Sequence, residues 1–193
     1  MDIDFTGFVG DCLVSGRLDL RADRLTDQLN ADGQVTLREV VLEGLDGGRV
    51  EAATFSIERS QLCAVVGSGP RGAQILRMPT DVRRLQAQIG PYTVLGRYHG
   101  PVGATSLQTF SEREPMVPLT DVTIAYVVNS IVEVRDLTVL IVNRELAAWY
   151  HEPDDASPAL SASPGSTSAS YRGSAARPDG LGELAGTPTP GRR

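Results

Sequence analysis

Apolar and polar residues alternate along several short segments of the chain, and this two-residue period is typical of half-buried β-strands. Ile3 and Phe5 alternate with polar neighbours in the first segment, and the turn residue Gly10 separates it from the second. Five strands are expected before residue 67, and a comparable series of five begins at residue 83. The predicted strands cover residues 3–7, 12–20, 35–43, 49–57 and 61–66 in the first series and residues 83–89, 92–99, 117–127, 131–142 and 145–150 in the second.

A short helix is expected between the second and third strands of each series. Leu25 and Leu29 are four positions apart, so they share one face of a helix that Asn30 can end. Residues 105–110 repeat this arrangement in the second series with two apolar residues three positions apart. We expect each helix to cover one end of a small barrel.

The two series also match in sequence. Residues 10–17 and 90–97 share the frame Gly-x-x-x-Val-x-Gly-Arg, and residues 35–40 and 117–122 share Val-x-Leu-x-acidic-Val. Val50-Glu51 is matched by Val132-Glu133, and Arg59 is matched by Arg144. The order is preserved, while the offset grows from 80 residues (10 to 90) to 85 residues (59 to 144). Self-similarity of this kind predicts a tandem duplication.

These patterns predict an all-β fold of two tandem five-stranded small β-barrel modules, each with one short helix. The first module covers residues 1–66, and a glycine-rich linker covers residues 67–81. The second module covers residues 82–152. Residues 153–193 are rich in Ser, Pro, Gly and Ala and hold few large apolar side chains, which predicts a disordered tail.

Composition narrows the possible functions. The formal net charge is −6, the chain has no lysine, and the part before the tail carries the whole negative balance, which argues against a nucleic-acid partner. No apolar run is long enough to span a bilayer, and the acidic N-terminus is unlike a signal peptide. Cys12 and Cys63 are expected to be small buried hydrophobes and not a disulfide. We therefore expect a cytoplasmic protein without a membrane span.

The second series resembles a small bacterial domain of uncharacterised function. Residues 96–101 fit its Gly-x-x-His-x-Pro segment, residues 118–122 its Pro-Leu-Thr-Asp-Val strand, and residues 142–144 its Val-Asn-Lys/Arg turn. The first series is a degraded version in which Asp19 stands in the place of His99. This resemblance implies a fold and says little about activity.

The five-strand series, ending in Phe-Ser-Ile-Glu-Arg-Ser-Gln-Leu at residues 55–62, distantly resembles the Sm-like barrel. In that family the last two strands meet at an Ile-Arg-Gly-type turn, which binds RNA bases together with an Asn in the preceding loop. Glu58-Arg59-Ser60 and Asn143-Arg144-Glu145 depart from this turn, because an acidic residue lies beside each arginine. The resemblance implies the barrel, with RNA binding as an alternative function.

The sequence predicts no catalytic, metal or cofactor site. His99 and His151 are the only histidines, and neither has a His or Cys partner at the spacing of metal ligands. No Gly-x-Ser-x-Gly nucleophile elbow is present. Glu51 and Glu133 fit water-facing strand residues better than two copies of an acid–base pair.

Arg59 and Arg144 are the candidate contacts for a ligand or partner, because each lies at a repeated tight turn. The sequence favours a non-enzymatic interaction or scaffold protein with a protein partner, and leaves homo-oligomer formation open. The first alternative is an Sm-like RNA-binding protein. The second is a small-ligand sensor, which a deep apolar pocket between the two modules would favour.

Overall fold

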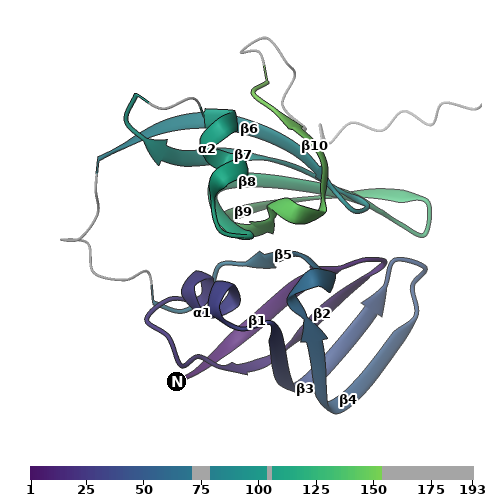
Figure 1. Cartoon of the computed structure of the whole chain (residues 1–193). Helices are drawn as coiled ribbons and strands as arrows, with labels where there is room; N and C mark the ends of the chain where they lie inside the picture. The colour runs from purple at the N-terminus through teal and green to yellow at the C-terminus, as the bar shows by residue number, and fades with distance from the viewer. Residues whose placement is uncertain (71–78, 104–105, 154–193) are drawn as a thin grey trace, which may run out of the picture. The chain divides into compact units, whose positions relative to one another are not determined.

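The computed structural model describes residues 1–70, 79–103 and 106–153, and it is an all-β fold with two short α-helices (Figure 1). All ten predicted strands and both predicted helices are confirmed within these residues. The elements are β1 (Asp2–Val9), β2 (Cys12–Asp19), α1 (Leu25–Ala31), β3 (Gln34–Gly44), β4 (Arg49–Glu58), the 3₁₀ turn η1 (Arg59–Gln61), β5 (Leu62–Val66), β6 (Thr80–Ile89), β7 (Tyr92–Pro101), α2 (Ser106–Glu112), β8 (Met116–Val128), β9 (Ile131–Asn143), the 3₁₀ turn η3 (Arg144–Leu146) and β10 (Ala147–His151).

The strands form one open antiparallel sheet in the order β10-β6-β7-β8-β9-β5-β1-β2-β3-β4. The first half of the chain (β1 to β5) and the second half (β6 to β10) each contribute five neighbouring strands, and β5 pairs with β9 to join them. The structure therefore corrects the prediction of two tandem small β-barrel modules, because the ten strands form one open sheet. The pairing satisfies main-chain groups along one edge of each half, and those groups would be costly to bury unpaired.

A β-bulge occurs at the same place in both halves. Glu39 in β3 and Asp121 in β8 have positive φ angles of 51° and 48°. Opposite them, the pairing register shifts at Gly16 in β2 and at Gly96 in β7. A Cβ added at Gly16 would lie 2.8 Å from the carbonyl oxygen of Arg38, so the close approach of the strands requires glycine. The repeated Gly-Arg pair of the sequence thus marks the bulge, which bends the sheet.

Strand register also corrects one residue match made from the sequence. Glu51 lies opposite Val41 and Asp136 lies opposite Thr123, and both Val41 and Thr123 stand two residues beyond the bulge. Asp136 is therefore the positional counterpart of Glu51. Glu133 lies nearer the tip of the β8–β9 hairpin, which is longer than the β3–β4 hairpin.

Two hydrophobic clusters form the core, and each takes side chains from both halves. The cluster centred on the first half includes Met116 and Ile141 of the second. The cluster centred on the second half includes Phe8 and Ala64 of the first. Each half therefore buries apolar side chains of the other half as well as its own, at the joint that the β5–β9 pairing forms.

Two sequence predictions fall wholly or partly on residues outside the described part of the chain. The predicted linker includes residues 71–78, and the predicted disordered tail lies outside from residue 154 onward. The module boundaries therefore stay predictions. Among the residues that the structure does describe, neither helix has the length and apolar character needed to cross a membrane.

Candidate partner-contact site

Arg59 opens the 3₁₀ turn between β4 and β5 and is half-buried. Its Nη1 donates a hydrogen bond to the carbonyl oxygen of Asn30 at 2.8 Å, near the end of α1. Its main-chain nitrogen donates to the carbonyl oxygen of Gly33 at 2.9 Å. A guanidinium group at this position satisfies carbonyl groups that the helix leaves unpaired.

Arg144 occupies the corresponding place after β9. Its Nε donates to the carbonyl oxygen of Arg113, just beyond α2, and its main-chain nitrogen donates to the carbonyl oxygen of Pro115 at 2.9 Å. The two arginines thus make the same kind of contact with the end of the short helix in their own half. Both guanidinium groups are bonded to main chain, and a ligand-binding role for Arg59 and Arg144 stays a prediction.

Asn143 connects the two arginine turns. Its Nδ2 donates to the carbonyl oxygen of Arg59 at 3.0 Å, and its Oδ1 accepts from the main-chain nitrogen of Glu145 at 3.2 Å. The Asn143 side chain is buried, with only 1% of the residue exposed. The sequence predicted no role of its own for Asn143, which appears there only within the turn motifs. A polar residue that directly follows the apolar run at residues 139–142 was the available signal.

Asn30 makes a second polar link between the halves. Its Oδ1 accepts from the main-chain nitrogen of Met116 at 2.9 Å, and its Nδ2 donates to the carbonyl oxygen of Met116 at 3.0 Å. The sequence predicted only that Asn30 ends the first helix. Because Arg59 also bonds to the Asn30 carbonyl, Asn30, Arg59 and Asn143 form one continuous hydrogen-bonded chain across the joint.

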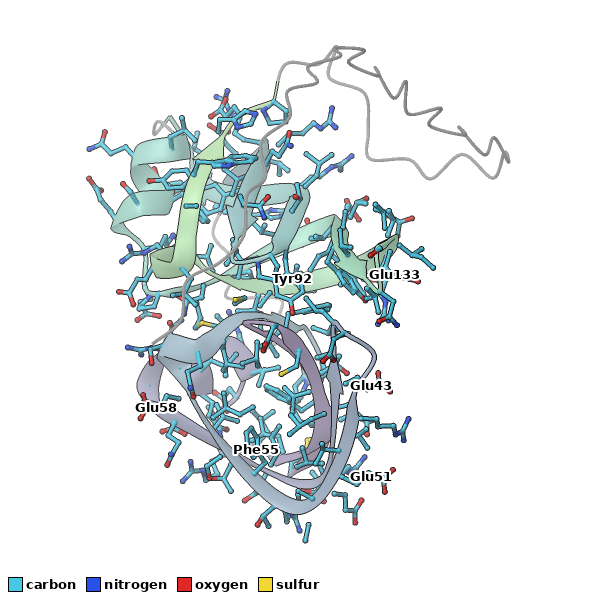
Figure 2. All side chains as sticks on the ribbon, turned by 90° about the vertical axis from the view of Figure 1, so that its right-hand side faces the viewer. Glu43, Glu51, Phe55, Glu58, Tyr92 and Glu133 are labelled. Atoms are coloured by element: carbon cyan, nitrogen blue, oxygen red, sulfur yellow. The ribbon has the colours of Figure 1, made fainter. Side chains whose placement is uncertain are left out.

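Tyr92 makes a third link and lies where the two halves meet (Figure 2). Its hydroxyl donates to the carbonyl oxygen of Cys12 at 3.1 Å, and the Phe8 ring packs edge-on with centroids 5.2 Å apart. Burial raises the pKa of the Tyr92 hydroxyl, and burial likewise raises the pKa values of the Cys12 and Cys63 thiols. Thiols with raised pKa values hold little thiolate near neutral pH.

The histidines are held by local contacts. His99 Nε2 lies 2.8 Å from the Thr120 hydroxyl, and the His151 ring lies against Trp149 with centroids 5.2 Å apart. Across residues 1–70, 79–103 and 106–153, no group of three or more His, Cys, Asp or Glu side chains is arranged to hold a metal ion.

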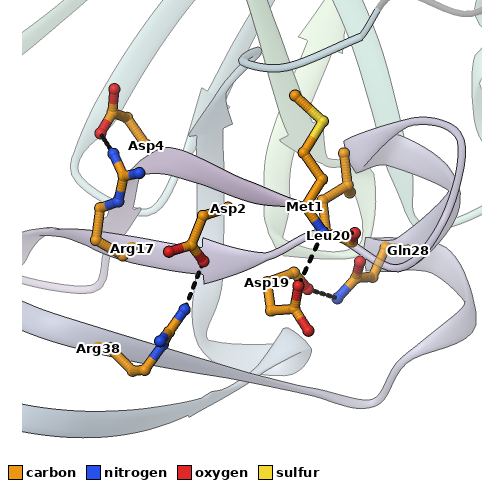
Figure 3. Close-up of polar contacts among 8 residues, drawn as sticks. All are labelled: Met1, Asp2, Asp4, Arg17, Asp19, Leu20, Gln28 and Arg38. Carbon is orange, nitrogen blue, oxygen red and sulfur yellow. Dashed lines mark hydrogen bonds and ion pairs between the residues drawn. The ribbon is translucent and has the colours of Figure 1, made fainter.

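Acidic partners accompany several exposed arginines of the first half. Arg17 of β2 pairs with Asp4 of the neighbouring strand β1, and Arg38 of β3 pairs with Asp2 of β1 across the strand between them (Figure 3). Asp19 accepts from the terminal amine of Met1 at 3.0 Å, and this hydrogen bond lowers its pKa. Nucleic-acid binding uses arginines that are free to neutralise phosphates. The paired charges on β1, β2 and β3 do not provide such a surface.

A surface hollow of about 390 Å³ lies along β3 and β4. Two carboxylates, Glu39 and Glu51, border it, and the rest of its lining is small and apolar. The hollow belongs to the first half alone and adjoins the bulge. It is therefore not a pocket between the two halves, the feature that would favour a small-ligand sensor. Its lining residues are Glu39, Val40, Val41, Glu51, Ala52 and Ala53.

The two end strands of the sheet have one free edge each. β4 pairs only with β3, and β10 pairs only with β6, within the residues described here. Phe55 on β4 is 38% exposed and Trp149 on β10 is 42% exposed (Figure 2 labels Phe55). Proline and charged side chains often protect an edge from further pairing. Neither strand contains proline, and β10 has no Asp, Glu or Arg, whereas β4 carries Arg49, Glu51 and Glu58. In the part of the chain that the structure describes, β4 and β10 therefore each leave one main-chain edge unpaired.

The outward-facing main-chain groups of β4 can be assigned. Ser56 lies directly opposite Thr36, and their hydroxyl oxygens are 2.9 Å apart. Close side chains of this kind are typical of an antiparallel pair that exchanges no main-chain hydrogen bonds. The main-chain N–H of Ser56 therefore points away from β3, toward the free edge.

Comparison of the chain with protein-family models, with curated proteins and with solved structures finds no match.

Proposed function

We propose that this chain is a non-enzymatic interaction or scaffold protein that binds a partner protein by strand addition. The observation that carries this proposal is the pair of free edges, β4 and β10, which end the ten-stranded sheet and expose Phe55 and Trp149. An added strand gains affinity from main-chain hydrogen bonds and specificity from alternate side chains. The edges of β4 and β10 offer both unpaired main-chain groups and exposed side chains.

The proposal includes descent of the two halves from one duplicated unit, related to the small bacterial domain and distantly to Sm-like barrels. Support comes from the repeated strand order, from the bulge at Glu39 and Asp121, and from the arginine turn that follows the fourth strand of each half. Duplication explains why the two free edges differ. One edge belongs to a fourth strand and the other to a fifth.

The test is capture of partners from lysate of the source cells by the full chain and by two edge variants. Ser56→Pro removes an outward N–H of β4, and proline is tolerated at such an edge position. Ser56→Ala is the matched control, because it removes the hydroxyl and keeps the N–H. A partner retained by wild type and Ser56→Ala but lost by Ser56→Pro supports strand addition.

Two results would count against the proposal. Turnover of a metabolite by the purified chain, with no partner recovered, would point to an enzyme. Salt-sensitive binding of single-stranded RNA that disappears in the Arg59→Ala, Arg144→Ala double variant would favour the RNA-binding alternative.

A further inference from the structure

We infer that the partner strand at these edges is supplied by a second copy of this chain, so that β10 of one copy pairs with β4 of the next. This inference rests on the proposed function and names the partner. The evidence is inside the molecule, because the pairing of β5 with β9 already joins a fifth strand of one half to a fourth strand of the other.

The internal joint defines the geometry. β5 and β9 run antiparallel, and Val65 lies opposite Ile141 at the centre of the pairing. The main-chain nitrogen of Gly67 donates to the carbonyl oxygen of Val139 at 2.9 Å and extends the pairing beyond the end of β5. The joint is therefore an ordinary antiparallel ladder, which another fourth and fifth strand could repeat.

β10 has the same local geometry as β5. Each strand follows a 3₁₀ turn that begins with arginine. Each pairs with the first strand of its half and skips one residue, Cys63 in β5 and Ala148 in β10. Trp149 therefore occupies the position of Ala64.

β4 matches β9 in the same way. Ile57 lies opposite Val35, and Val142 lies opposite Val117 at the corresponding point of the second half. In the internal joint, Val142 pairs with Ala64. Repeating that register between two copies places Trp149 opposite Ile57. It also places Tyr150 opposite Ser56 and His151 opposite Phe55.

The chemistry of the two edges fits this register. The outward N–H of Ser56 meets the main chain of Tyr150, and the exposed side chains of Phe55 and Trp149 become covered. At least two side-chain contacts are not repeated: Glu58 stands in the place of Asn143, and a carboxylate cannot donate to a carbonyl oxygen, while Cys12 stands in the place of Tyr92. We therefore expect the joint between copies to be weaker than the joint within one.

The association is head-to-tail, because the two edges are different surfaces. Each copy offers one β4 edge and one β10 edge, so every added copy leaves a new edge open until a ring closes. A symmetric dimer would instead use the same edge twice.

The experiment uses two blocked variants of the full chain. Ser56→Pro blocks the β4 edge, and Trp149→Asp places a charge in the apolar contact of the β10 edge. The molar mass is measured by light scattering over about three decades of protein concentration around 1 µM. It should rise with concentration for wild type and for the matched controls Ser56→Ala and Trp149→Phe. Each blocked variant alone should stay a single chain. An equimolar mixture should form a two-chain species and nothing larger, because only one compatible pair of edges is left.

Fluorescence supplies an independent readout, because Trp149 is the single tryptophan of the chain. Its emission should shift to shorter wavelength as wild type associates and should stay constant in Ser56→Pro, whose substitution lies on the opposite end strand. Circular dichroism checks that both blocked variants keep the fold.

Three results would overturn the inference. The wild-type chain could stay monomeric at every concentration, or both blocked variants could still associate. The third result is a dimer that is lost in Ser56→Pro alone and does not form again when the two blocked variants are mixed. A monomeric chain that still captures another protein through β4 would reject self-association and leave the proposed function in place.

Discussion

The side-chain amide of Asn143 donates to the carbonyl oxygen of Arg59 at 3.0 Å, and this contact joins two turns that lie 84 positions apart in the chain. The same amide accepts from the main-chain nitrogen of Glu145. A buried amide that satisfies one group in each half couples the folding of the two halves. The arginine turns, which the sequence marks as repeated, thus help to hold the molecule together.

Asn143→Ala should lower the free energy of unfolding by about 1–3 kcal/mol, because it leaves the Arg59 carbonyl and the Glu145 N–H without their partner. Urea denaturation of the full chain measures the change. Gln108→Ala at an exposed position of α2 is the control and should stay within about 0.5 kcal/mol of wild type. Equal losses in both variants would show that the Asn143 contacts contribute nothing specific.

Tyr92→Phe should destabilise the chain by about 1 kcal/mol, since it removes the hydroxyl that donates to the Cys12 carbonyl oxygen and keeps the buried ring. The midpoint of urea unfolding should fall while its slope stays constant. A change in slope would mean that the two halves no longer unfold together. An unchanged midpoint would contradict a stabilising role for this bond.

Tyr126→Phe should behave differently. The Tyr126 hydroxyl is buried and makes no hydrogen bond of ordinary geometry among the described residues, while its ring packs against Phe8 with centroids 5.8 Å apart. The nearest candidate donor is Arg135, whose guanidinium carbon lies 5.6 Å from the centre of the Tyr126 ring. Removing an unsatisfied hydroxyl and keeping the ring should leave stability unchanged or raise it by up to about 1 kcal/mol. The same denaturation assay tests this, and a loss as large as that of Tyr92→Phe would reveal a partner for the hydroxyl.

Glu39→Gly should be tolerated or stabilising by up to about 1 kcal/mol, because glycine adopts the positive φ of the bulge without steric cost. Glu39→Val should destabilise the chain, since a β-branched residue is strained at that φ. Thermal unfolding of both variants gives the comparison. If valine were tolerated as well as glycine, the bulge would not be held in this conformation.

The sequence predicted the strands well because the alternation of apolar and polar residues is a local pattern. It did not predict the joined sheet because strand pairing depends on residues that are far apart in the chain. The sequence does contain one indication of which strands lie inside the joined sheet. The runs at residues 62–66 and 139–142 are continuously apolar, which is typical of strands covered on both faces. By contrast, residues 54–58 of β4 alternate. Comparing these runs would have indicated that β5 and the end of β9 are interior strands.

The candidate site was less predictable than the fold. Arg59 and Arg144 were found from repetition, yet their bonds go to carbonyl groups, which carry no side-chain signal in a sequence. Asn30 and Asn143 act across about 85 positions, and only the β5–β9 pairing brings them to their partners. Both residues bond to main-chain groups in the other half of the molecule, so their roles depend on how the strands are connected and paired.

Stability should fall as pH rises above about 9, because burial raises the pKa of Cys63 from 9.0 and of Tyr92 from 10.0. In the unfolded chain these groups lose protons near their ordinary values, while the folded chain keeps them. The stability that these two groups contribute is therefore fully present below about pH 9. It decreases as the pH rises toward their pKa values in the folded chain, by about 1.4 kcal/mol per pH unit for each proton that the unfolded chain has lost and the folded chain keeps. Urea denaturation between pH 7 and about 10.5 measures the slope. The Cys63→Ala, Tyr92→Phe double variant should show a shallower decrease, and a slope equal to that of wild type would assign the alkaline loss to other groups.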